Sequence, residues 1–137
     1  MTNFLQAPND HAFHYARVED HPRWKWQTMS DYRIDLWRLF DIAVPGFKSE
    51  WVRCSNGILM IPAGYHWNGA NWPAVDTPSI IRASCIHDAL YQAITAQSVI
   101  NVKSEADFVF YKICRNDGMW RFRAWYAYQA VKMFGNP

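Results

Sequence analysis

The sequence has no apolar run that approaches the roughly 20 residues of a membrane-spanning helix, so we expect no transmembrane segment. It also has no closely spaced pair among its three cysteines, Cys54, Cys85 and Cys114. This spacing argues against a disulfide framework and favours reduced, buried thiols. A Cys85–Cys114 bridge stays open, because spacing does not show whether two helices align them.

Neither sign of charge is in large excess. The 14 basic and 12 acidic residues give a net charge of +2, which is too balanced to indicate a nucleic-acid-binding protein. The first residues, Met1–Pro8, lack the basic end and the apolar stretch of a signal peptide. We therefore expect a protein that is made in a cytoplasm and does not bind nucleic acid.

The chain is rich in apolar and aromatic residues. Of its 137 residues, 50% are hydrophobic and 17% are aromatic, including eight tryptophans. This composition argues against disorder, and the length suits one domain with a sizeable core. We expect residues 1–137 to form a single domain, with residues 1–23 as an N-terminal arm.

Residues 24–66 show the alternating pattern of β-strands. Side chains at every second position from Trp24 to Ile34 fall on one side of a ribbon, and short apolar runs follow. Asn56-Gly57 lies between two such runs and is typical of a two-residue hairpin, since both residues tolerate a positive φ. The pattern predicts a small antiparallel sheet of three or four strands.

Later residues change to a helical period. Residues 64–78 are rich in glycine, asparagine, proline and aromatics, which indicates an ordered, packed loop. Three helices are expected after it, at about 79–97, 104–116 and 119–134, with Gly135 ending the last. Strands followed by helices predict the α+β class.

The segment around His87 has the strongest chemical signal. His87 and Tyr91 lie one helical turn apart, and Asp107 opens the next predicted helix. If the two helices pack antiparallel, Asp107 reaches one nitrogen of His87 and leaves the other as a base toward water. Asp88 points about 100° away, and we expect it to bind a hard cation with carbonyls of residues 69–71.

A purely structural role is open for the same residues. Asp107 follows Ser104 by three residues and is placed to complete a capping box. Asp88 has Arg82 or Lys112 as an alternative partner, and the histidine alone is equally well explained as a core residue that holds a carbonyl. His66 is a second candidate partner for the histidine in a transition-metal site, although the spacing fits no known helix or hairpin signature.

The residues His87-Asp88-x-x-Tyr91, with the later Asp107, resemble the motif of phospholipase A2. Gly69 lies eighteen residues before the histidine, near the place of that family's calcium-loop glycine. The resemblance implies that His87 activates water and that Tyr91 and Asp107 orient it. It also implies an ester hydrolase that acts on lipid or another ester.

The same resemblance implies a calcium ion that stabilises the oxyanion of the ester. Its protein ligands would be Asp88 and backbone carbonyls near Gly69, with Trp67 and Asn71 flanking that glycine. Calcium is therefore the expected cofactor.

A second resemblance covers roughly residues 24–135. The segments Ile61–Tyr65, Asn68–Pro73, His87–Tyr91 and Ala106–Phe110 are similar, in this order, to a family of small phage and prophage proteins of unknown function. The resemblance implies a phage origin and a place in the host cytoplasm or the virion. It also supports an alternative without catalysis, in which a virion component or host-defence antagonist acts by binding a viral or host protein or a second copy.

The last predicted helix interleaves basic and aromatic residues. These are Trp120, Arg121, Arg123, Trp125, Tyr126, Tyr128 and Lys132. The pattern fits stacking on single-stranded bases, a lipid interface or an oligomer interface. We favour an ordinary amphipathic helix whose aromatic side chains face the core.

Overall fold

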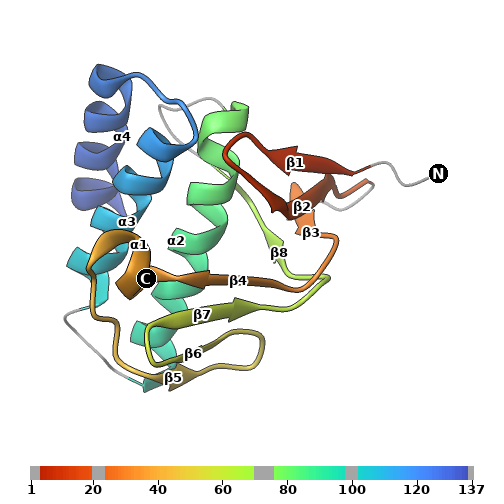
Figure 1. The fold of residues 1–137 in the computed structure, drawn as a ribbon, viewed down its shortest axis with the longest axis vertical. Coiled ribbons are helices and arrows are strands. Elements are labelled where there is room, and N and C mark those ends of the chain that lie inside the picture. The colour runs from red at the N-terminus through yellow and green to blue at the C-terminus, as the bar shows by residue number, and fades with distance from the viewer. Residues whose placement is uncertain (1–3, 20–23, 70–75, 98–101, 136–137) are drawn as a thin grey trace.

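The computed structural model describes residues 4–19, 24–69, 76–97 and 102–135, which form two antiparallel sheets and four helices (Figure 1). One sheet has the order β1 (Leu5–Ala7), β2 (Asp10–Arg17), β3 (Trp26–Thr28) and β8 (His66–Trp67). The other has the order β4 (Tyr32–Asp35), β7 (Ile58–Ile61), β6 (Arg53–Ser55) and β5 (Phe47–Lys48). The predicted α+β class is confirmed.

The helices are α1 (Leu36–Phe40), α2 (Pro78–Gln97), α3 (Val102–Asn116) and α4 (Arg121–Phe134). The last three begin within about two residues of the predicted positions, the usual precision of a boundary read from sequence. The short α1 is not predicted by the sequence pattern. Its N-cap is Asp35, whose side chain accepts a hydrogen bond of 3.0 Å from the backbone N–H of Arg38.

The Asn56-Gly57 hairpin is confirmed. Asn56 has a φ of 52° and Gly57 a φ of 79°, and the turn joins β6 to β7 with Ser55 opposite Ile58. Two consecutive positive φ values define the turn whose twist suits antiparallel strands. A side chain at Gly57 would also meet the Cβ of Trp37, so the turn packs closely against α1.

The expectation of an N-terminal arm over residues 1–23 is wrong for the described part of that segment. Residues 5–7 and 10–17 are strands of the first sheet, and β2 pairs with β3. Phe13 and Tyr15 alternate along β2 and are buried in the core. Three histidines in the segment suggest a solvated chain, but the alternating apolar residues determine its structure.

The predicted sheet over residues 24–66 is likewise divided. β3 belongs to the first sheet and β4 to the second, so the two-residue alternation from Trp24 to Ile34 does not run along one strand. The predicted loop over residues 64–78 contributes β8, in which Trp67 pairs with Trp26. Residues 70–75 of that loop lie outside the described residues.

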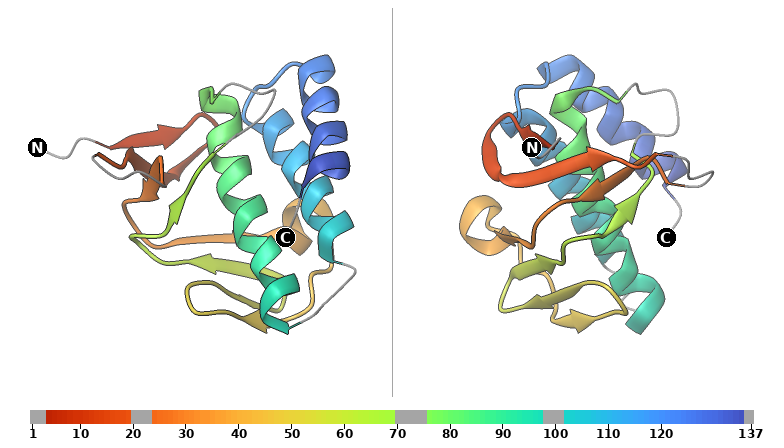
Figure 2. Two further views of the ribbon diagram at one scale, coloured as in Figure 1. Left: turned by 180° about the vertical axis from the view of Figure 1, so that it is seen from behind. Right: turned by 90° about the vertical axis from the view of Figure 1, so that its right-hand side faces the viewer.

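Helix α2 is the centre of the molecule. It lies between the strands on one side and α3 and α4 on the other (Figure 2). Its buried apolar residues are Ile80, Ile81, Ala83, Cys85, Ile86, Ala89 and Leu90. A helix buried on most faces has a weak amphipathic pattern, and the polar side chains that it does carry must find partners inside the protein.

Arg82 shows how one such side chain is satisfied. It is 2% exposed, and its Nε and Nη2 donate to the two carboxylate oxygens of Asp117, at 3.0 Å each. Its Nη1 donates to Asp10 at 3.1 Å and to Tyr32 at 3.0 Å. This network joins α2 to β4, to the start of β2 and to the end of α3.

The described cysteines Cys54, Cys85 and Cys114 are all buried free thiols, so Cys85 and Cys114 are not bridged. Among the described helices, none has the length and apolar character to cross a membrane.

Candidate functional site

Helices α2 and α3 bring His87 and Asp107 into direct contact. The Nε2 atom of His87 lies 2.6 Å from Oδ1 of Asp107. The same oxygen accepts a hydrogen bond of 2.6 Å from the hydroxyl of Tyr91, one turn further along α2. The packing of two helices thus joins three of the residues that the sequence singles out.

Lys103 completes the cluster from the first turn of α3. Its Nζ donates to the other oxygen of Asp107, Oδ2, at 2.8 Å. It also donates to the backbone carbonyls of Val131 and Lys132, at 3.3 Å each. The carbonyl of Val131 also accepts from the backbone N–H of Gly135, and a positive charge is favoured near the carbonyl end of a helix. Lys103 therefore links Asp107 to the last turn of α4.

The protonation of this cluster follows from its donors. Burial alone would raise the pKa of Asp107, but hydrogen bonds from His87, Lys103 and Tyr91 lower that pKa below its ordinary value. An ionised carboxylate accepts hydrogen bonds and donates none, so Nε2 of His87 carries the proton. In a neutral imidazole the other nitrogen, Nδ1, is then a proton acceptor.

The ring of His87 is held between aromatic side chains. Its centroid lies 4.1 Å from that of Tyr91 and 5.3 Å from that of Phe110. The side chain keeps 12% of its surface exposed. Among the described residues, the partner of His87 is Asp107 through Nε2, and none of them hydrogen-bonds to Nδ1. The ring is fixed in orientation while one nitrogen stays open.

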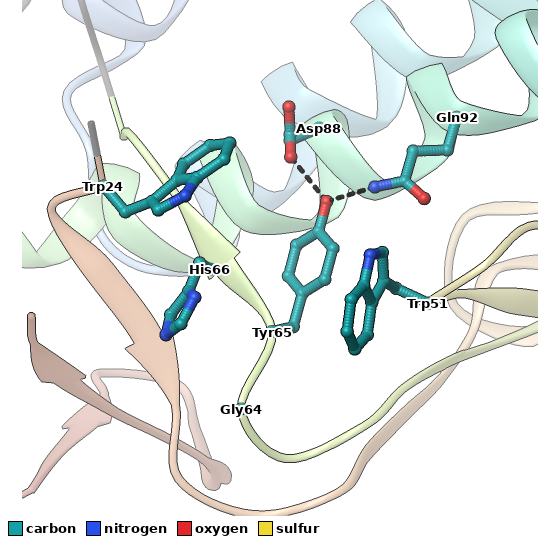
Figure 3. A pocket seen from close by; sticks show the side chains of 7 residues that line it. All are labelled: Trp24, Trp51, Gly64, Tyr65, His66, Asp88 and Gln92. Atoms are coloured by element: carbon teal, nitrogen blue, oxygen red, sulfur yellow. Dashed lines mark hydrogen bonds between the residues drawn. The ribbon is translucent and has the colours of Figure 1, made fainter.

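Asp88 faces a different side of α2. Its Oδ2 accepts a hydrogen bond of 2.5 Å from the hydroxyl of Tyr65, which in turn accepts one of 2.9 Å from Nε2 of Gln92 (Figure 3). Ser49 donates to Oε1 of Gln92 at 2.7 Å, which fixes the orientation of the amide. The chain of donors runs from Ser49 to Asp88 and ends on an acceptor.

This chain lies in the wall of a cavity of about 370 Å³. The lining residues are Trp24, Trp51, Gly64, Tyr65, His66, Asp88 and Gln92. In Figure 3, Trp24 and His66 lie on one side of Tyr65 and Trp51 on the other. Burial raises the pKa of Asp88, which the hydrogen bond from Tyr65 partly offsets. The cavity is therefore lined mainly by aromatic side chains. Its one acidic group among the described residues, Asp88, follows His87 along α2.

Among the predicted calcium ligands, the side chains of Asp88 and Trp67 have other partners in the described part of the chain. Asp88 accepts from Tyr65, and a side chain at Gly69 would meet Asp76 and Trp26. Trp67 is buried and donates from its indole to Ser84 at 3.0 Å. Asn71 lies outside the described residues. Within those residues no cluster of three or more His, Cys, Asp or Glu side chains is placed to hold a metal.

The structure also bears on the alternative partners that the sequence suggests for Asp88, Asp107 and His87. Arg82 pairs with Asp117 and Asp10, so it is not the partner of Asp88. Helix α3 begins at Val102, which puts Ser104 inside the helix instead of at its cap. His66 lines the cavity beside Asp88 and takes no part in the His87 cluster.

The sequence patterns did not single out Lys103, Tyr65 and Gln92. A signal existed for Lys103, which is four residues before Asp107 and so lies on the same face of the helix. Tyr65 reaches Asp88 from a strand end twenty-three residues away, and no local spacing indicates that contact.

The fold and the cluster define an α+β protein with a buried His–Asp–Tyr arrangement between two helices. A family described as "Protein of unknown function (DUF1353)" matches residues 48–131, more than half of the chain, and the protein belongs to this family. Searches of curated proteins and of solved structures found no match. His87, Asp88, Tyr91 and Asp107 all fall inside the matched segment, whereas β1, β2 and β3 precede it.

Proposed function

We propose that this protein is a hydrolase of esters in which His87 activates the attacking water. The observation that carries the proposal is the 2.6 Å contact between Nε2 of His87 and Asp107, which leaves Nδ1 as a base. A general base has to be oriented and to have its developing charge stabilised, and Asp107 does both. Tyr91 and Lys103 hold Asp107 in place.

The proposed reaction is the hydrolysis of an ester by a water molecule that His87 deprotonates. Nδ1 of His87 takes a proton from water as the water oxygen attacks the ester carbonyl. The imidazolium that forms is stabilised by the carboxylate of Asp107. The ester C–O bond then breaks, and the imidazolium returns its proton to the leaving alkoxide. An acid and an alcohol leave the site, and His87 is neutral again.

The resemblance to phospholipase A2 supports the same assignment, because it implies a water-activating histidine oriented by Asp107 and Tyr91. We assign no step to calcium. Asp88 is the one carboxylate that lines the cavity among the described residues, and a calcium ion takes about six to eight oxygen ligands. The phage origin that the second resemblance implies stays a prediction.

The proposal is tested with the purified chain and esters of short and long acyl chains, including phospholipid vesicles, with calcium or with a chelator. We expect wild type to release acid and His87→Asn to be at least about 100-fold slower, the loss typical of a missing general base. His11→Asn, on an exposed part of β2, is the control and retains full activity.

Two results would overturn the proposal. One is the absence of ester cleavage by wild type in both metal conditions. The other is equal cleavage by wild type and His87→Asn, with both variants folded by circular dichroism. In that case the cluster only connects the two helices. That outcome would favour the alternative, in which the protein has no catalytic activity and acts by binding a partner.

A further inference from the structure

Helix α4 is inverted relative to an ordinary surface helix. Its buried residues are small: Ala124, Ala127, Ala130 and Val131. Its large apolar residues point outward, with exposed fractions of 71% for Phe122, 52% for Trp125, 50% for Tyr126 and 73% for Met133. The predicted aromatic core face of this helix is therefore wrong except at Tyr128, whose ring packs against Phe108 and Tyr111 of α3. We call these four exposed residues the outer face of α4.

The outer face is one continuous surface. At about 100° per residue, its four side chains fall within an arc of about 100° around the helix axis. Arg121 and Lys132 are exposed and lie next to this arc on the side of Trp125. Figures 1 and 2 place α4 on the outside of the molecule, beyond α3 as seen from the sheets. Exposed apolar surface of this kind usually marks an interaction site.

The charge of this region differs from that of the rest of the chain. Residues 102–135 contain six basic and three acidic residues, against eight basic and nine acidic elsewhere. Of the three acids, Asp107 and Asp117 are buried in ion pairs. Helix α4 itself contains no acidic residue. The two exposed charges that lie beside the outer face, Arg121 and Lys132, are thus both positive, although the net charge of the whole chain is only +2.

We propose that the outer face of α4 binds an anionic lipid surface. Phenylalanine, tryptophan and methionine insert at the boundary between head groups and acyl chains, and flanking lysine and arginine attract anionic head groups. A second copy of the chain fits less well. An isologous contact of α4 with α4 would bring the pair Arg121 and Lys132 toward the same basic pair of the second copy, with no acidic residue on the helix to neutralise them.

The experiment is co-sedimentation of the full chain with phosphatidylcholine vesicles that contain or lack phosphatidylglycerol. We expect wild type to bind the anionic vesicles at least tenfold better than the neutral ones. The double variant Phe122→Ser/Trp125→Ser should lose at least tenfold in binding. Arg121→Gln/Lys132→Gln should bind both vesicles equally, because it keeps the apolar face and loses the charge.

A matched control is available on α1. Trp37 and Leu39 are 55% and 53% exposed, so Trp37→Ser/Leu39→Ser removes similar apolar surface at another place. This control should bind vesicles as wild type does. His87→Asn should also bind as wild type does, so a failure of the hydrolase proposal does not affect this measurement.

Three results would overturn the lipid proposal. The first is a wild-type protein that sediments with neither kind of vesicle, and this result is decisive by itself. Equal loss in the α1 control would show that the effect is not specific to α4. Binding of a single-stranded oligonucleotide, or concentration-dependent dimerisation abolished by Phe122→Ser/Trp125→Ser, in the absence of vesicle binding, would assign the face to a different partner.

Discussion

Two polar clusters on helix α2 are built differently, although they start only five residues apart. Arg82 directs three nitrogens to Asp117, Asp10 and Tyr32 and is almost fully buried. His87 directs one nitrogen to Asp107 and keeps part of its ring at the surface. The first cluster joins four elements of the fold, whereas the second orients a single ring.

The difference separates a structural role from a chemical one. A buried arginine with two carboxylates is a fixed ion pair, and removing one member leaves an unpaired charge inside the protein. An imidazole that is hydrogen-bonded to a carboxylate through one nitrogen only has a proton acceptor to offer at the other. The contrast also appears in the acids, since burial raises the pKa of Asp117, whereas hydrogen bonds lower that of Asp107.

The largest expected effect is on stability, from Arg82→Met. The substitution leaves Asp117 buried without its partner, so we expect a loss of about 3–5 kcal/mol in the free energy of unfolding. Urea denaturation followed by circular dichroism measures it. Arg33→Met, at an exposed position of β4, should change stability by less than about 0.5 kcal/mol. Equal effects of the two variants would contradict the structural role of Arg82.

A second prediction concerns Asp107→Asn and pH. The folded protein lowers the pKa of Asp107, so its ionised form is favoured by folding. This contribution is complete above the pKa of the unfolded chain and is lost as pH falls through the folded pKa. We expect a loss of about 1–3 kcal/mol near neutral pH from the unmatched donors, shrinking below about pH 4. Denaturation of both proteins from pH 7 to pH 3 measures the difference, and a difference that grows on acidification would contradict the assignment.

The smallest effect is expected from Tyr91→Phe. It removes one hydrogen bond to Asp107 and leaves those from His87 and Lys103, so stability should fall by about 0.5–1.5 kcal/mol. Ester cleavage, if His87 is the base, should decrease by less than it does in His87→Asn, because Tyr91 positions Asp107 and does not touch the substrate. A Tyr91→Phe variant as inactive as His87→Asn would give Tyr91 a direct role.

Local patterns in the sequence predicted much of this molecule. The period of the three long helices and the Asn56-Gly57 turn are set by residues close in the chain, and the structure has them where expected. The contact of His87 with Asp107 could also be predicted from the sequence, because two packed helices have few ways to bring two inward-facing residues together. Their chemical roles stay predictions.

The remainder depends on contacts that no local pattern encodes. The division of the strands between two sheets is decided by packing on α2, and Tyr65 approaches Asp88 from the end of a strand. Helix α4 differs from the prediction because its buried positions are mostly small residues. The buried positions of α4 carry Ala124, Ala127, Ala130 and Val131, so most of the large side chains are left outside.

The three buried thiols can report local opening of the fold through the rates at which they are labelled. Burial raises the pKa of Cys54 to about 11, and it also raises those of Cys85 and Cys114. A thiol in this state reacts with a labelling reagent only after its surroundings open. Cys54 lies in the second sheet, Cys85 in α2 and Cys114 in α3, so the labelling rate of each follows the opening of a different layer of the fold.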